Sequence, residues 1–336
     1  MKIIVTGGSG FIGYHLINAL VAGGNDVLSV DRVPPPVRHK EMVYLKMEAQ
    51  CARAVDLLRE WKPDAIVNLA AQTGVAGYVR YSAVDFYLDD NVKVLASVAD
   101  VAAETGARLV HASSGALYSL SETRDGTMPP WASTYAISKL ACEQFLRLYQ
   151  LQRGLDWCAL RFSNVYGPQW SPKAVVSAFV SSALRGEKMQ IHGTGIQGRD
   201  FLYVDDVVSA ITRAIGSDPA RGRVMDLGTG TITSVRDLAV AVYTELDKRG
   251  VAFPEGEWID FDTDTGEGAP TSWQELSDAR DILKWGDTVD LALGLEVTMD
   301  EYVRRALAGE EPSKEYRRAV GRGKFPIDVS GLRGDE

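Results

Sequence analysis

The stretch Gly7-Gly8-Ser9-Gly10-Phe11-Ile12-Gly13 follows the apolar segment 2–6 and opens an amphipathic segment at 11–22. The first segment has the residues of a buried strand, and the second has the apolar spacing of a helix. Glycines between a strand and a helix permit a tight turn, and they let the backbone approach a pyrophosphate at the helix N-terminus. The stretch therefore predicts a dinucleotide cradle made by Gly7, Gly10, Phe11, Ile12 and Gly13. A turn that needs glycine only for helix packing is the alternative.

Outward from this stretch, short apolar runs alternate with amphipathic ones through the first 230 residues, which is the pattern of βαβ units. The expected strands are 2–6, 26–30, 42–46, 65–69, 108–112, 157–162 and 223–227, and the expected helices include 11–22, 52–61, 91–104 and 134–153. Beyond residue 165, glycine and proline interrupt shorter elements, which predicts a loop-rich lobe.

The expected fold class is therefore α/β, a Rossmann-type doubly wound parallel sheet with a smaller C-terminal substrate lobe. We expect the NAD-binding domain over 1–167, with 200–228 contributing to it, and the substrate lobe over 168–199 and 229–310. Residues 311–336 are expected to form a polar C-terminal tail.

Composition narrows the possible functions. The chain of 336 residues carries a net charge of −9 and no basic run, so nucleic acid and anionic membrane are poor partners. No apolar stretch reaches the roughly 18 residues that span a bilayer, and no signal pattern opens the chain, so we expect a cytosolic protein. Neither the three cysteines nor the four histidines have the spacing of a disulfide framework or a metal site.

Two acidic residues at strand ends extend the cradle. Asp31 closes the second expected strand 18 residues after Gly13, where a carboxylate accepts hydrogen bonds from a ribose diol and repels a 2′-phosphate. This position favours NAD over NADP, although the adjacent Arg32 argues in the other direction. Glu48, after the third strand, is placed at the adenine edge, with a solvated surface acid as an equal alternative.

Tyr135 and Lys139 stand four residues apart at the start of an expected helix, on one face of it. A tyrosine with a pKa of about 10 is a poor base at neutral pH, so a neighbouring cation is needed to favour its phenolate. Ser114 ends the fifth strand and supplies a hydroxyl that orients an alcohol or bonds a developing carbonyl. Ser114, Tyr135 and Lys139 are the predicted catalytic residues, and Ser113 is the competitor of Ser114. A solvent-exposed helix pair is the alternative for Tyr135 and Lys139.

Together these motifs resemble the extended short-chain dehydrogenase/reductase family, whose best-known members are NAD-dependent nucleotide-sugar epimerases and dehydratases. The resemblance covers about residues 1–305 and is carried by Thr6–Gly13, Leu69-Ala70-Ala71, Ser113-Ser114 with Tyr118, Tyr135 with Lys139, and Arg199-Asp200-Phe201 with Val204-Asp205-Asp206. It implies that Ala70 and Ala71 line the nicotinamide, that Asn91 steadies the active site, that Asn164 contacts nucleotide phosphates and that Arg199 binds the diphosphate. An ion pair with Asp200 or Asp205 is the alternative for Arg199, and selection for small volume is the alternative for the two alanines.

The residues after Ser114 bear on the reaction. Dehydratases of this family usually carry an Asp-Glu pair there, and this chain has Gly115-Ala116. The resemblance then implies an NAD-dependent nucleotide-sugar epimerase that oxidises carbon 4 to a keto sugar and returns hydride to the other face. The alternative is an NAD(P)-dependent 4-ketoreductase or dehydrogenase of a nucleotide sugar or a less anionic, sugar-like substrate. A second alternative is a binding protein that senses a dinucleotide. The resemblance also implies a homodimer that pairs helices 91–104 and 134–153.

One segment departs from the family pattern. Relatives usually present a second diphosphate-binding arginine in the C-terminal lobe, and the corresponding stretch here, 260–268, is rich in carboxylates. Carboxylates repel a diphosphate. We therefore expect this stretch to be a loop that points to solvent, with a less anionic substrate as the alternative.

Overall fold

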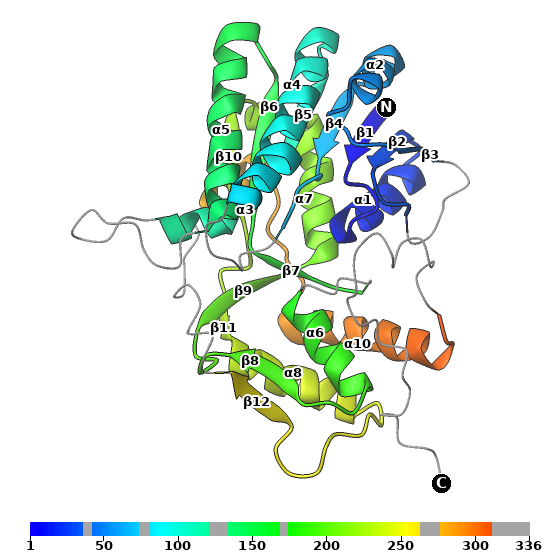
Figure 1. Ribbon diagram of the computed structural model, residues 1–336, viewed down its shortest axis with the longest axis vertical. Coiled ribbons are helices and arrows are strands. Elements are labelled where there is room, and N and C mark those ends of the chain that lie inside the picture. Colours follow the sequence, from blue (N-terminus) through cyan, green and yellow to red (C-terminus); the bar gives the residue numbers. More distant parts are fainter. Residues whose placement is uncertain (36–41, 74–80, 121–132, 169–173, 263–275, 311–336) are drawn as a thin grey trace, which may run out of the picture. The chain divides into compact units, whose positions relative to one another are not determined.

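The computed structural model describes residues 1–35, 42–73, 81–120, 133–168, 174–262 and 276–310 (Figure 1). They form two compact units. The sheet unit consists of the described residues of Met1–Ser163, Asp205–Gly228 and Trp273–Asp287, and the second unit consists of those of Asn164–Val204, Thr229–Ser272 and Thr288–Glu336.

The sheet unit is built on seven parallel strands in the order β10-β6-β5-β4-β1-β2-β3. Their bounds are β1 Lys2–Thr6, β2 Asp26–Asp31, β3 Val43–Lys46, β4 Ala65–Asn68, β5 Arg108–Ser114, β6 Trp157–Phe162 and β10 Arg223–Leu227. The order 3-2-1-4-5-6 is that of a dinucleotide-binding sheet, and β10 is added beyond β6. The expected α/β fold with a Rossmann-type parallel sheet is confirmed.

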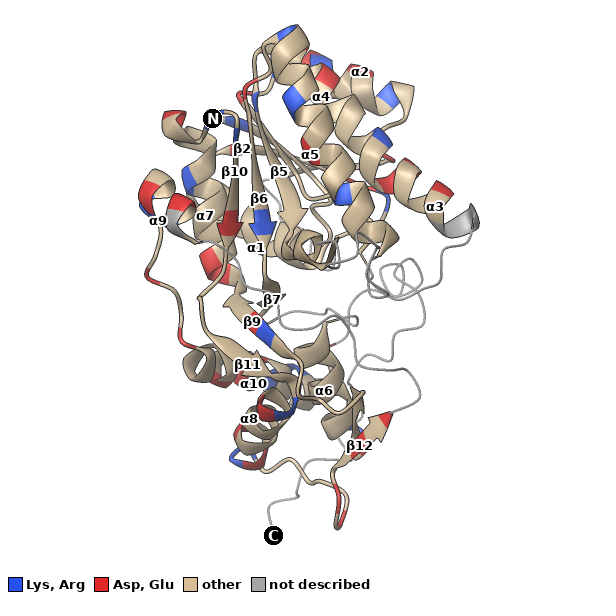
Figure 2. Cartoon of the chain, turned by 90° about the vertical axis from the view of Figure 1, so that its left-hand side faces the viewer, with Lys and Arg blue, Asp and Glu red and all other residues tan. Residues whose placement is uncertain are grey.

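Helices cover both faces of this sheet, which lies between α7 and α9 on one side and α2, α4 and α5 on the other (Figure 2). Burial on both faces explains why the strands are nearly continuous apolar runs. The bounds are α1 Phe11–Ala22, α2 Ala52–Trp61, α3 Tyr81–Tyr87, α4 Val94–Thr105, α5 Thr134–Arg153, α7 Val204–Gly216 and α9 Ser277–Leu283, with short 3₁₀ turns at Gly115–Leu120 and Asp218–Ala220.

The helix expected at 91–104 differs from the structure. Helical backbone begins at Tyr81 and continues through α3, a π-helical turn over Leu88–Lys93, and α4. A π turn holds one more residue than an α turn, and such turns are frequent at functional sites. Asn91 lies within this turn and is buried. The apolar period of the sequence does not reveal a single extra residue in a helix, so this segment was missed.

The second unit has a three-stranded sheet in the order β11-β9-β7, a two-stranded parallel sheet of β12 and β8, and three helices. The bounds are β7 Asn164–Tyr166, α6 Val175–Leu184, β8 Met189–His192, β9 Gly198–Tyr203, β11 Ile232–Ser234, α8 Val235–Asp247, β12 Ile259–Asp262 and α10 Leu291–Leu307. The helices pack their apolar faces together around Phe179, Leu238 and Leu295. The Ser177 and Tyr302 hydroxyls share a buried hydrogen bond of 2.8 Å inside this core.

The unit boundaries differ from the expected ones at two places. Strand β9, expected in part within the sheet domain, pairs with β7 and β11 of the second unit. In contrast, α9 and the buried Trp285, expected in the substrate lobe, belong to the sheet unit, because the Trp285 indole donates a 2.9 Å hydrogen bond to the Asp206 carbonyl. The expected tail, 311–336, lies outside the described residues.

Charge and apolar length bear on the expected partners. Acidic and basic residues are interspersed along the helices of the sheet unit in the view of Figure 2. Within the ranges that the structure describes, no helix combines the length and the apolar character needed to cross a bilayer.

Candidate active site

The glycine stretch forms a turn between β1 and α1 in which two glycines are required by the protein's own packing. Gly7 has a φ of +73°, and a Cβ there would lie 2.6 Å from the Ala70 backbone nitrogen. A Cβ on Gly13 would lie 2.4 Å from the Gly7 carbonyl oxygen. Packing therefore explains Gly7 and Gly13 without a ligand.

Gly10 is different. A Cβ built on it would meet only the Gly7 carbonyl oxygen, at 3.1 Å, and the residue is exposed. The first bond of α1 at this end runs from the Tyr14 amide to the Gly10 carbonyl, at 2.9 Å, so the amides of Phe11, Ile12 and Gly13 precede the helical ladder. An open glycine beside such amides is the arrangement that receives an anion.

Asp31 lies at the carboxyl end of β2, against this turn. Its carboxylate accepts hydrogen bonds from the amides of Ser9, at 3.0 Å, and Val33, at 2.9 Å. Burial raises the pKa of the Asp31 carboxyl, and these two amides oppose the rise. The amides fix the carboxylate beside the glycine turn, where a ribose diol is expected. Glu48, after β3, is exposed, which suits either of its two expected roles.

The strand order brings the predicted residues to one edge of the sheet. Strands β1, β4 and β5 are neighbours and parallel, so their carboxyl ends lie along one edge. The glycine turn follows β1, Ala70 and Ala71 follow β4, and Ser114 ends β5. Ala70 contacts the turn through the close approach of its backbone to Gly7.

The two competing serines have different partners, because successive strand residues point to opposite faces. The Ser113 hydroxyl donates a 2.6 Å hydrogen bond to Oε1 of Glu143. The Ser114 hydroxyl accepts from the Ala116 amide at 3.1 Å and hydrogen-bonds the Tyr135 side chain. The geometry therefore favours Ser114 as the serine beside the base.

Tyr135 and Lys139 occupy the first turns of α5, which the Ser133 side chain caps by accepting from the Ala136 amide at 3.1 Å. Burial raises the pKa of the Tyr135 phenol, and the hydrogen bond with Ser114 lowers it in part. Lys139 is only 2% exposed. Its Nζ donates to the Ala112 carbonyl at 2.7 Å and lies 5.9 Å from the centroid of the Tyr135 ring.

The alternative of a solvated tyrosine–lysine pair does not suit this buried ammonium. Burial lowers the pKa of Lys139, and the nearby Cys142 and Glu143 oppose that shift. A buried cation beside a phenol favours the phenolate. The pair therefore has the arrangement that we expect of a base and its electrostatic partner.

Asn91 uses its side chain to connect the segment after β4 with α5. Its Oδ1 accepts from the Gln72 amide at 2.7 Å, and its Nδ2 donates to the Ser138 hydroxyl at 2.8 Å. Ser138 in turn donates to the Tyr135 carbonyl at 2.7 Å. Through these hydrogen bonds Asn91 positions the first turn of α5.

A buried network beneath the site was not found from the sequence. Arg161 on β6 binds both carboxylate oxygens of Glu143, at 2.9 and 2.8 Å, and donates to the Tyr118 hydroxyl at 3.3 Å. Tyr118 donates to Asp226 on β10 at 2.6 Å, and burial raises its pKa to about 12. The four-residue spacing of Tyr135, Lys139 and Glu143 was the available signal, since it places all three on one helix face.

A second buried chain of polar groups crosses β1, β4 and β5. The Thr6 hydroxyl donates to Asn68 Oδ1 at 2.6 Å, and Asn68 Nδ2 lies 3.2 Å from His111 Nδ1. Burial, with a contribution from Lys139, lowers the pKa of His111 well below its ordinary value. The imidazole is therefore neutral, and it accepts from Asn68. Histidine at a strand position gave no signal of this role in the sequence.

In the second unit, Asn164 and Arg199 lie on neighbouring strands. Asn164 pairs with Phe201 in the β7–β9 register, two positions beyond Arg199, so Asn164 and Arg199 share one face of the small sheet. Asn164 Nδ2 donates to the Asp200 carbonyl at 3.3 Å, and burial lowers the pKa of the Arg199 guanidinium. This shared face supplies an amide and a partly buried cation.

Asp200 was one of the two alternative ion-pair partners expected for Arg199. Its carboxylate binds the turn that follows β10. Its carboxylate accepts from the amides of Thr229 and Gly230, at 3.0 and 2.9 Å, and from the Thr229 hydroxyl at 2.8 Å. Asp205, the other alternative partner of Arg199, belongs to the sheet unit. Its Oδ1 lies 3.8 Å from Nδ1 of His15.

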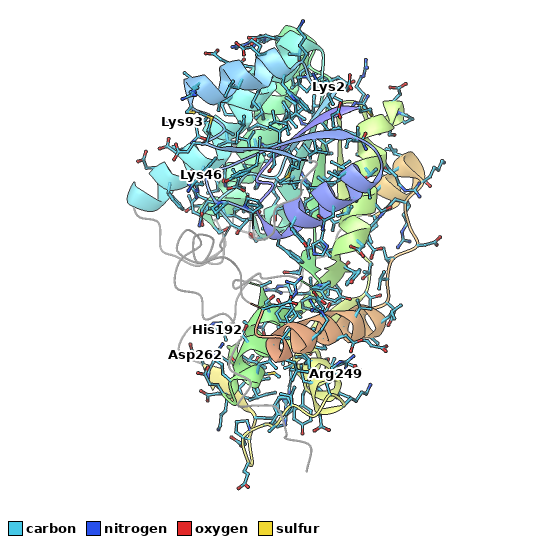
Figure 3. All side chains as sticks on the ribbon, turned by 90° about the vertical axis from the view of Figure 1, so that its right-hand side faces the viewer. Lys2, Lys46, Lys93, His192, Arg249 and Asp262 are labelled. Atoms are coloured by element: carbon cyan, nitrogen blue, oxygen red, sulfur yellow. The ribbon has the colours of Figure 1, made fainter. Side chains whose placement is uncertain are left out.

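The acidic stretch expected as a loop is in part a strand. Residues 260–262 lie in β12, which pairs with β8, and 263–268 lie outside the described residues. The Gln190 amide donates to Asp260 at 2.9 Å, and His192 Nδ1 lies 3.3 Å from Asp262 (Figure 3). The expectation of a loop is wrong for 260–262, which form a strand, because cross-strand partners for their polar side chains stabilise a β ladder. The expected exposure to solvent is found at Asp260.

These features fit a dinucleotide. An open glycine, three amides at a helix N-terminus and a fixed carboxylate lie along the same sheet edge as the half-buried Tyr135 phenol and the buried Lys139 ammonium. When bound, NAD supplies an acceptor and donor of hydride. No group of three or more potential metal-ligating side chains occurs among the described residues.

Known proteins resemble this chain over most of its length. It is 33% identical to UDP-glucose 4-epimerase from Mycolicibacterium smegmatis, over 89% of this chain and 98% of the relative. It is 30% identical to dTDP-D-glucose 4,6-dehydratase from Mus musculus, over 90% of this chain and 88% of the relative.

The structure of UDP-glucose 4-epimerase with UDP-glucose from Thermotoga maritima superposes with a TM-score of 0.79 at 26% identity, covering 90% of this chain and 99% of that one. UDP-glucuronic acid 4-epimerase from Bacillus cereus, in complex with UDP-glucuronic acid and NAD, superposes with a TM-score of 0.76 at 25% identity, with coverage of 90% and 98%.

The family model "NAD dependent epimerase/dehydratase family" matches residues 3–228, which include the glycine turn, Ser114, Tyr135 and Lys139. Together with the relatives, this match confirms the expected family and its dependence on NAD. The chain belongs to the NAD dependent epimerase/dehydratase family.

Proposed function

We propose that the protein is an NAD-dependent nucleotide-sugar epimerase that acts at carbon 4. The observation that carries this proposal is the contact of Ser114 with Tyr135 beside the buried Lys139, at the edge of the sheet that also holds the open Gly10. Such a site is suited to removing a hydroxyl proton and a hydride from one carbon.

The residues of the chain divide the proton chemistry between them. Tyr135, as phenolate, takes the hydroxyl proton, and bound NAD would accept the hydride that leaves the same carbon. Ser114 donates a hydrogen bond to the substrate oxygen as it becomes a carbonyl, and the Lys139 ammonium stabilises the phenolate. After the keto sugar has turned, the reduced cofactor would supply the hydride to the other face of the carbonyl carbon, Tyr135 returns the proton to the oxygen, and the epimer is released.

Dehydration fits this site less well than epimerisation, although relatives include dehydratases. Elimination of water needs an acid and a base beside carbons 5 and 6 of the sugar. After Ser114 the chain continues with Gly115 and Ala116, at the start of a 3₁₀ turn, and neither side chain exchanges a proton. This difference supports the epimerase branch.

The substrate we propose is a nucleotide sugar, with UDP-linked hexoses as the first candidates. Three of the four proteins named above are UDP-glucose or UDP-glucuronic acid 4-epimerases by their names. The shared face of Asn164 and Arg199 offers an amide and a cation, the groups that suit diphosphate oxygens. Carboxylates at Asp260 and Asp262 are held by β8 side chains, so they do not need to face that anion.

We also propose a homodimer formed through α5. Large apolar side chains are exposed on one face of α5, at Ile137 and Leu140 and, about two turns further on, at Leu148 and Leu151. Phe86 and Leu88, in the helical segment that runs from α3 into the π turn, are exposed as well. A helix face of this composition is normally covered. A second copy of the chain, which presents the same face, is the occupant that cyclic symmetry allows.

The proposal is tested by incubating the purified protein with UDP-, dTDP-, GDP- and CDP-sugars and following the products by NMR, without added cofactor. We expect a carbon-4 epimer of one sugar and NAD released on denaturation. A protein that requires added NADPH and accumulates a reduced product is a ketoreductase, and this outcome overturns the proposal. Tyr135→Phe is the control for the base.

A further inference from the structure

Arg32 follows Asp31 directly at the end of β2, and its guanidinium is held by a carboxylate from a distant part of the chain. Its NH1 lies 3.1 Å from Oδ1 and 3.0 Å from Oδ2 of Asp90. Asp90 is only 13% exposed, whereas the Arg32 side chain is 46% exposed. The acid is therefore the more buried partner, and its contact with NH1 holds the guanidinium.

The position of Arg32 is the one at which an arginine changes cofactor preference. In dinucleotide-binding sheets the acid at the end of the second strand binds the ribose hydroxyls, and an arginine near it accommodates a 2′-phosphate. This chain has both residues in sequence, which made the expectation of NAD ambiguous. In the structure a third group, the Asp90 carboxylate, forms an ion pair with this arginine.

Two consecutive residues of the π-helical turn, Asp90 and Asn91, make contacts in different directions. Asp90 reaches the end of β2, while Asn91 binds Gln72 and Ser138. Consecutive residues of one helical turn thus serve the cofactor side and the base side of the proposed site.

The local charges reinforce the effect of the contact. Asp31, Arg32 and Asp90 together carry a net charge of −1, which opposes the approach of a 2′-phosphate. Without Asp90 the two remaining charges cancel, and the guanidinium is released to turn toward an anion. Arginine forms paired hydrogen bonds with phosphate when it is not otherwise engaged.

We propose that Asp90 is a cofactor-specificity residue, which excludes NADP by holding Arg32 away from the 2′-position. The proposal rests on the proposed function as an NAD-dependent epimerase. Asp90, a residue of the π turn, thus acts in cofactor selectivity and takes no part in the chemistry of the sugar.

The test measures dissociation constants for NAD⁺ and NADP⁺ by calorimetry on cofactor-free protein, for the wild type, Asp90→Asn, Arg32→Gln and the double variant. We expect Asp90→Asn to tighten NADP⁺ binding about tenfold, the size of one charge-assisted contact, and to change NAD⁺ binding less than about twofold. In the Arg32→Gln background, the same substitution is expected to give no such gain.

Asp89→Asn is the matched control. Asp89 lies in the same turn and pairs with Lys93, which is labelled in Figure 3, rather than with Arg32. It removes an equal charge and is expected to leave NADP⁺ binding unchanged.

Three outcomes overturn the proposal: unchanged NADP⁺ affinity in Asp90→Asn, a gain that persists without Arg32, or an equal gain in Asp89→Asn. A wild-type protein that fails to bind NAD⁺ refutes the proposed function instead, so the two failures are distinguishable.

Discussion

Ser113 donates a 2.6 Å hydrogen bond to the buried carboxylate of Glu143, and this contact separates the tasks of two adjacent serines. Ser113 is anchored to the interior of the sheet unit. Ser114, on the opposite face of β5, remains beside Tyr135.

The two serines are therefore expected to respond differently to alanine. Ser114→Ala removes the hydrogen bond that lowers the Tyr135 pKa, so the phenolate forms at higher pH and the rising limb of kcat/KM moves to higher pH. Ser113→Ala leaves that limb in place and lowers the free energy of unfolding by about 1 kcal/mol, because a buried carboxylate loses a donor. The pH–rate profiles and urea unfolding of both variants check this, and identical profiles for both would contradict the assignment.

Tyr135→Phe is expected to lower kcat by about 10²- to 10⁴-fold, the contribution of a general base. Tyr149→Phe, on the same helix, is the matched control, since its hydroxyl binds Asp100 and the Ala96 carbonyl. It should retain wild-type turnover. Initial rates with the epimerised sugar and thermal unfolding distinguish lost chemistry from lost fold.

Gly10 and Gly13 are expected to differ when changed to alanine. Gly13→Ala places a Cβ against the backbone of the turn and should lower the unfolding free energy by more than about 1 kcal/mol. Gly10→Ala meets a single oxygen at 3.1 Å, so the fold should persist while NAD⁺ binding weakens. Calorimetric titration with NAD⁺, alongside thermal unfolding, measures the two effects. Undiminished NAD⁺ affinity in Gly10→Ala would argue against the cradle.

Acid sensitivity is expected to depend on His111. Its pKa lies well below the ordinary 6.5 in the folded protein, so below that pH the unfolded chain binds a proton that the folded chain does not. Its contribution is constant above about pH 6.5 and falls by up to about 1.4 kcal/mol per pH unit below it. His111→Asn keeps an acceptor for Asn68 and should flatten the dependence of unfolding free energy on pH between 6.5 and 5. An unchanged slope would exclude His111 as its source.

Leu148→Arg is expected to give monomers, because it places a charge on the exposed apolar face of α5. Val240→Arg, at an exposed position on α8 of the second unit, is the control and should leave the assembly unchanged. Light scattering at micromolar concentration measures both. A monomeric wild type would remove the proposed dimer.

The sequence predicted the sheet well because its strands are buried on both faces and its turns carry glycine. All seven expected strands of the central sheet occur within about two residues of their expected bounds, and α1, α2 and α5 match theirs. The glycine turn, Ser114, Tyr135 and Lys139 fall along one sheet edge, because the edge follows from strand order. Local patterns of this kind do not depend on distant partners.

The features that the sequence missed are those that depend on contacts between distant residues. The bonds of Glu143 with Arg161 and of Asn68 with His111 join different strands and helices, and no spacing rule connects them. Helix α9 was placed in the wrong lobe because its attachment depends on contacts with distant residues, among them the bonds from Trp285 to Asp206, from Arg213 to Leu283 and from Ser217 to Ile282. The choice between Ser113 and Ser114 likewise needed the position of Glu143.

The wide helical turn over Leu88–Lys93 has a consequence for insertions and deletions. Removing one residue there would restore a regular α-helix and rotate everything on one side of the cut by about 100°. Either Asp90 or Asn91 would then point in a new direction, and one of the two contacts would be lost. This segment should therefore tolerate substitution at its exposed positions far better than any change in its length.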